Sequence, residues 1–99
     1  MTLEQEFAAD LNTMMDKSHA LGGKPHAMRR KLHNAPGGAV SMAQKAMLQS
    51  TIHKGMVRMI KLGREDLTLE ALVIKYAQKG LFSNQILQTA QWRLTQARI

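Results

Sequence analysis

The sequence predicts an all-α protein, a compact single-domain bundle of five or six short helices over residues 1–99. Apolar residues recur at spacings of three and four, as in Leu3, Phe7 and Leu11, which is the period of one helix face. The alternating pattern with β-branched enrichment that indicates strands is absent. A chain of 99 residues and 11.1 kDa has room for one hydrophobic core.

Glycine and proline mark the ends of the first two helices. The first helix is expected over residues 3–20, because Gly22-Gly23 can supply a left-handed C-cap. Pro25 fits the first turn of a short second helix, where its missing amide donor costs nothing. The Ala-Pro-Gly-Gly break at residues 35–38 ends that second helix.

The middle of the chain predicts two further helices. The third carries the apolar stripe Val40, Ala43 and Met47. The pattern slips at residues 49–51, which predicts a kink or a short loop. A fourth helix then resumes the apolar stripe and ends at Gly63. Its stripe is formed by Ile52, Met56, Met59 and Ile60.

Hydroxyl residues predict where the last two helices start. Thr68 can cap a fifth helix that Gly80 stops, and Ser83 can cap a sixth. Their buried faces are expected to be Leu69, Leu72, Val73 and Tyr76 in the fifth helix and Ile86, Ala90, Leu94 and Ala97 in the sixth.

The formal net charge of +7 is concentrated in one part of the chain. Residues 21–64, the basic segment, carry nine Lys and Arg residues and no Asp or Glu. Such asymmetry predicts a polyanion or an acidic protein face as partner, and a solvated basic surface is the alternative. The residues expected to bind nucleic acid or an acidic partner are Lys24, Arg29, Arg30, Lys31, Lys54, Arg58, Lys61 and Arg64.

Residues 63–73, Gly-Arg-Glu-Asp-Leu-Thr-Leu-Glu-Ala-Leu-Val, form a distinctive motif. Related elements lie at residues 20–28 and 37–48, and Leu81-Phe82-Ser83 follows downstream. Together they resemble a family of small helical bacterial and phage proteins and terminal domains with the signature G-R-x-D-L-T-x-E-A-L-V. The resemblance implies a helical architecture and a prokaryotic or phage source, and it implies no particular activity.

Helix capping can account for the polar residues of this motif. Asp66 and Thr68 are typical of helix starts, and Glu70 lies where a helix N-terminus favours negative charge. Glu65, Asp66 and Glu70 could also be grouped as catalytic acids, but capping explains them without a ligand.

Residues suited to catalysis or metal binding are few. The chain has no cysteine, which excludes thiol nucleophiles, disulfides and cysteine-ligated zinc. His19, His26 and His33 recur every seven residues, but the Gly-Gly pair interrupts the helix that would align them. We therefore expect a non-enzymatic protein with no catalytic residue, no metal and no cofactor.

The chain carries no signal for export or membrane insertion. The N-terminal residues lack the basic start and apolar run of a signal peptide. No stretch approaches the roughly 18 apolar residues of a membrane span. We expect a cytoplasmic protein with no membrane partner.

Trp92 lies off the apolar stripe of the last helix. At 100° per residue it falls near Gln88 and Thr95. It either covers the end of a neighbouring helix or anchors a protein interface. The eight methionines also have two interpretations: they either fill the core or form an adaptable surface for a protein partner.

These observations predict a binding protein that engages nucleic acid or a nucleoprotein through the basic face of its second and fourth helices. Binding should be mostly sequence-independent, because none of the twelve alanines is followed four positions later by glycine, as in many helix-turn-helix motifs. The alternative is a protein-interaction module, such as a mobile-element inhibitor of a host defence complex in the manner of anti-CRISPR proteins. A homodimer is compatible with so small a core.

Overall fold

Helices make up the regular secondary structure of the described residues. The computed structural model describes residues 1–49 and 54–98 and contains no strand within them. Its elements are α1 (Leu3–Ala20), α2 (His26–Asn34), α3 (Gly38–Leu48), α4 (Lys54–Lys61), the 3-10 turn η1 (Glu65–Leu67), α5 (Leu69–Ala77) and α6 (Asn84–Arg98). The predicted all-α class is confirmed.

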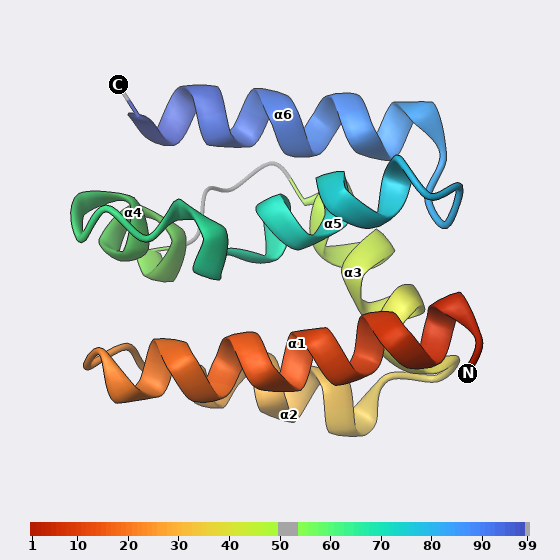
Figure 1. The fold of residues 1–99 in the computed structure, drawn as a ribbon, viewed down its shortest axis with the longest axis horizontal. Helices are drawn as coiled ribbons and strands as arrows, with labels where there is room; N and C mark the ends of the chain where they lie inside the picture. The colour runs from red at the N-terminus through yellow and green to blue at the C-terminus, as the bar shows by residue number, and fades with distance from the viewer. Residues whose placement is uncertain (50–53, 99) are drawn as a thin grey trace.

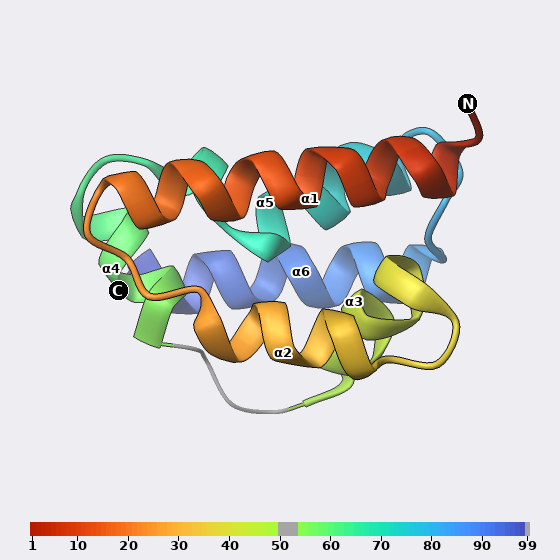
Figure 2. The same ribbon diagram turned by 90° about the horizontal axis from the view of Figure 1, so that it is seen from below.

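The helices are stacked in three layers, with α1 and α2 on one side, α6 on the opposite side and α3, α4 and α5 between them (Figure 1). Figure 2 shows α2 running antiparallel to α1 and lying beside α3. The radius of gyration is 12.4 Å, close to the roughly 13 Å of a compact domain of this length. The chain therefore folds as one domain.

The core gathers apolar side chains from every layer. Phe7 of α1 meets Tyr76 of α5 and Phe82 edge-on, with ring centroids 5.3 and 5.2 Å apart. The predicted faces of α5 and α6 are buried, except that Ala97 is half-buried. In α3 the buried stripe is rotated from the predicted one, so Val40 lies at its margin. The buried residues of α3 are Ala39, Met42, Ala43, Ala46 and Met47.

Most predicted helix ends are confirmed. α1 has the expected bounds, and Gly22 leaves it with φ of 87°. The Thr68 hydroxyl accepts a hydrogen bond from the Ala71 N–H at 3.1 Å. The Ser83 hydroxyl accepts one from the Ile86 N–H at 3.2 Å. These caps fix where α5 and α6 begin.

The fourth helix follows its predicted stripe in part. Met56 and Met59 are buried and Ile60 is half-buried, whereas Ile52 lies outside the described residues. The pattern slip predicted at residues 49–51 also falls mostly outside them; α3 ends at Leu48 and α4 begins at Lys54.

Capping is an incomplete explanation of the acidic residues in the motif at 63–73. Glu70 does lie in the first turn of α5, but it is only 1% exposed and pairs with the fully buried Arg93. Glu65 pairs with Arg98, and Asp66 pairs with Arg64. The physical reason is that a buried guanidinium needs a carboxylate partner, and α6 brings Arg93 to the start of α5.

Candidate nucleic-acid interface

The second helix presents cations because its apolar side is narrow. α2 contains no buried residue; Met28 and Leu32 are half-buried and pack against the core. The rest of the helix faces outward, so Arg30 and Lys31 are exposed. The exposed cations agree with the basic face that the sequence predicts for this second helix.

Two of the predicted binding residues are engaged in ion pairs. Arg29 Nη2 lies 2.6 Å from Asp16 Oδ1 of α1. Arg64 donates two hydrogen bonds to the Asp66 carboxylate, at 3.2 and 3.1 Å, and these bonds hold the pKa of Asp66 below its usual range. Both pairs are exposed, so each offsets charge locally and contributes little to stability.

The other predicted cations are exposed and, in the part of the chain that the structure describes, form no ion pair. They are Lys24, Arg30, Lys31, Arg58 and Lys61. Lys54 is the first residue of α4, and its side chain lies outside what is described. We call the five exposed residues, together with Lys45, the basic surface.

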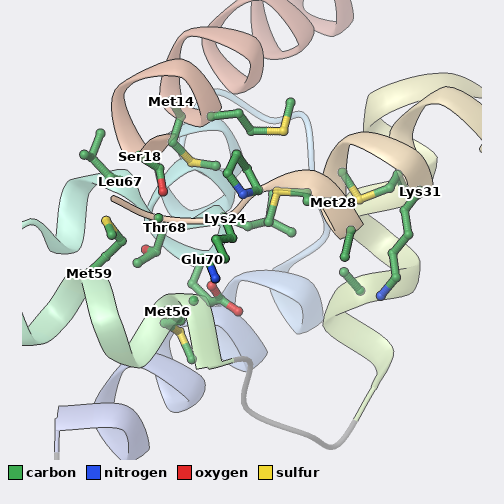
Figure 3. Close-up of a pocket in the computed structure, with 18 residues that line it drawn as sticks. Met14, Ser18, Lys24, Met28, Lys31, Met56, Met59, Leu67, Thr68 and Glu70 are labelled. Carbon is green, nitrogen blue, oxygen red and sulfur yellow. The ribbon is translucent and has the colours of Figure 1, made fainter. Parts of the chain in front are cut away.

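Four residues of the basic surface, Arg58, Lys24, Lys31 and Lys45, border neighbouring features of the fold. A Cβ placed on Gly22 would stand 3.1 Å from Arg58 Nη2, so the guanidinium of α4 reaches the turn between α1 and α2. Lys24 and Lys31 border a pocket of about 310 Å³ between α1, α2, α4 and the start of α5 (Figure 3). Lys31 and Lys45 border a second, smaller hollow between α2 and α3. The cations therefore extend from α4 across the turn to α2 and α3.

Lys45 was missing from the predicted site although it lies in the basic segment. It is exposed on α3, and the contact between α2 and α3 brings it toward Lys31. On the predicted helix Lys45 lies opposite the stripe of Val40, Ala43 and Met47, and this position was the sequence signal that could have added it to the site.

Five of the seven acidic residues form ion pairs, and the other two lie in the first turn of α1. Within the described structure Asp10 pairs with Lys75, Asp16 with Arg29, and Glu70 with Arg93. Glu65 and Asp66 pair with arginines as described above, and Glu4 and Glu6 lie in the first turn of α1. The basic surface thus carries charge that these acids do not compensate.

Trp92 is 53% exposed on α6, as its off-stripe position suggested. Its exposed neighbours along the helix are uncharged and include Gln88, Thr95 and Gln96. α6 lies on the opposite side of the fold from α1 and α2 (Figure 1). The basic surface of α2 and the exposed tryptophan therefore lie on different layers of the molecule.

Histidines and acids do not assemble into a metal site in the described residues, where no group of three or more potential ligands is found. His19 and His26 do meet across the Gly-Gly turn, with ring centroids 5.8 Å apart. The turn folds α2 back on α1, so the two rings approach without a continuous helix.

Comparison with family models, with curated proteins and with solved structures finds no match to this chain. Among the described residues, no helix is both long and apolar enough to cross a membrane.

Proposed function

We propose that this chain is a non-enzymatic binding protein that engages nucleic acid, or a nucleoprotein complex, through its basic surface. The observation that carries the proposal is the set of exposed cations on α2, α3, α4 and the intervening turn, in a segment without acidic residues. Cations that contact phosphates release condensed counterions, which drives binding at low salt. Phosphate contacts do not read bases, so binding is mostly sequence-independent.

The ion pairs support a role without catalysis. A general acid or base must be free to exchange a proton with a substrate. Asp10, Asp16 and Glu70 are instead held by cations, as are the two acids at residues 65 and 66. We place the protein in the cytoplasm of a prokaryotic cell, as the family resemblance and the sequence imply.

A salt titration tests this function. Two fluorescent DNA duplexes of unrelated sequence are titrated with the protein over a range of salt concentrations, and binding is followed by anisotropy. With about five phosphate contacts, log affinity should fall against log salt with a slope of about −4 to −5, equally for both duplexes. An RNA duplex of the same length shows which nucleic acid is preferred. No binding of either duplex at low salt would contradict the proposal.

A second candidate function is a protein-interaction module, such as a mobile-element inhibitor of a host defence complex. The exposure of Trp92 favours it, because exposed tryptophans surrounded by uncharged residues are typical centres of protein interfaces. In that case the basic surface would contact an acidic face of the partner. A homodimer through α6 is a further form of the same proposal.

A further inference from the structure

The pocket between α1, α2, α4 and the start of α5 is lined mostly by apolar side chains (Figure 3). Six of the eight methionines line it, and they come from four different helices. They are Met14, Met15, Met28, Met42, Met56 and Met59. Its volume of about 310 Å³ is at the lower end of the range of small-ligand sites, roughly 300–1,000 Å³.

Two of the polar side chains that line the pocket, those of Glu70 and Thr68, already have partners. Glu70 lines it, but its carboxylate accepts the hydrogen bond from Arg93 Nε at 3.0 Å. Thr68 donates its hydroxyl hydrogen to the Glu65 carbonyl at 2.8 Å and accepts from the Ala71 N–H. The lining therefore offers mainly dispersion contacts, and no fully buried side-chain polar atom of the described residues lacks a partner.

Two exposed lysines also line the pocket. Lys24 precedes α2 and Lys31 lies on it; both border the pocket and are exposed. Neither forms an ion pair in the described part of the chain. A mostly apolar lining that includes two exposed lysines is complementary to a molecule with an apolar body and one anionic end.

The wall formed by α2 and the methionines can adapt to such a molecule. α2 has no buried residue, and Gly22 and Gly37, with φ of 87° and 86°, stand before and after it. Methionine side chains are unbranched and flexible, so they follow the shape of a bound alkyl chain. We infer that this pocket binds an amphipathic organic anion, with its alkyl body among the methionines and its carboxylate beside Lys24 and Lys31.

Methionine methyl groups report this binding directly. Protein labelled with ¹³C at the methionine methyls is titrated with dodecanoate, below its micelle concentration and without nucleic acid. The signals of the six pocket methionines should shift saturably, and those of Met1 and Met47, which do not line the pocket, should stay in place. Absence of shifts at the pocket methionines would overturn the inference.

Two comparison ligands test the role of charge and chain. Dodecyltrimethylammonium has the same chain with the opposite charge, and acetate has the charge without the chain. Both should bind at least about tenfold more weakly than dodecanoate, since each lacks one half of the recognition. Equal binding of the cationic ligand would show an apolar groove without anion selectivity and would contradict the proposal.

Variants locate the site on the protein. Lys24→Gln with Lys31→Gln should weaken dodecanoate binding by about tenfold or more. Lys75→Gln with Lys79→Gln removes the same charge from exposed positions outside both the pocket and the basic surface, and should leave the affinity unchanged. Ala27→Phe narrows the pocket from an exposed position and should reduce binding while helicity by circular dichroism is retained. Wild-type affinity in either the Lys24 and Lys31 variant or the Ala27 variant would place the ligand elsewhere.

This inference does not rest on the proposed nucleic-acid function. Its readout is a set of methyl shifts in the absence of DNA, whereas the nucleic-acid proposal is judged by the salt dependence of anisotropy. One can fail while the other holds. If both hold, dodecanoate should compete with DNA for Lys24 and Lys31 and lower the apparent DNA affinity.

Discussion

Arg93 and Glu70 form an ion pair that is removed from solvent, with Nε of the arginine 3.0 Å from Oε2 of the glutamate. The pair joins α6 to the first turn of α5. Nη1 of Arg93 also donates to the backbone carbonyl of Gln49, just after α3, at 2.5 Å. One guanidinium thus connects three helices, and its hydrogen bonds offset the cost of burying the charge.

Loss of one partner should be strongly destabilising. Arg93→Met leaves the Glu70 carboxylate buried without its cation, and we expect a loss of about 3–5 kcal/mol in the free energy of unfolding. Urea denaturation followed by circular dichroism measures it. Glu70→Leu combined with Arg93→Met should cost less than the sum of the two single changes, because no unpaired charge is left. Near-neutral single variants would show that the pair carries little stability.

The sequence contained half of the information about this pair. Arg93 follows Ala90 by three positions and precedes Leu94 on the apolar stripe of α6, so its burial could have been predicted. The partner could not have been, because Glu70 is 23 residues away and the pairing depends on how α5 packs against α6. Helix periodicity defines faces, whereas it does not define which faces meet.

The same limit applies to the candidate site. The concentration of cations in the basic segment could be predicted from the sequence, and so could the exposure of Trp92. The ion pair between Arg29 and Asp16 was not, since it forms only when α2 folds back on α1. The pocket could not be predicted either. Its methionines belong to four helices, and in the sequence they occupy apolar positions typical of an ordinary core.

The hydrogen bond from Tyr76 Oη to Asp10 Oδ2, 2.5 Å long, should make stability depend on pH at both extremes. The bond from Tyr76, assisted by Lys75, holds the pKa of Asp10 below its usual value of 3.8. A carboxylate whose pKa is lower in the folded state than in the unfolded state stabilises the fold at pH values above its unfolded pKa. This contribution to stability is lost as the pH falls through the folded pKa. Tyr76→Phe should therefore reduce the loss of stability in acid, as measured by urea denaturation across the acid range.

At high pH the stability changes in the opposite direction, because it falls as the pH rises. Burial, followed by the hydrogen bond to Asp10, raises the pKa of Tyr76 from 10.0 to about 12. This contribution to stability is complete below pH 10 and is lost as the pH rises toward 12. Tyr76 is the sole tyrosine, so tyrosinate absorbance measures its titration directly. Asp10→Asn should lower the midpoint pH of the Tyr76 titration. An unchanged midpoint would mean that burial alone raises the pKa of Tyr76.

The exposed cations of α2 should determine the salt dependence of DNA binding. Arg30→Ala combined with Lys31→Ala should flatten the slope of log affinity against log salt by about 2, if each residue neutralises one phosphate. Lys75→Ala with Lys79→Ala removes the same charge from α5 and the turn that follows it, outside the basic segment, and serves as the matched control. Equal slopes for the two double variants would mean that net charge, and not the basic surface, governs binding.

Trp92→Ala separates the two proposed functions. Trp92 lies on α6, across the fold from α2, so its removal should leave the salt slope of DNA binding unchanged. A protein interface centred on this residue would instead lose about 2 kcal/mol or more of binding energy. The measurement is capture of a protein partner by the immobilised wild type and variant after nuclease treatment, beside the DNA titration. If wild type binds no nucleic acid at low salt and only the wild type retains a partner, the interaction module replaces the nucleic-acid function.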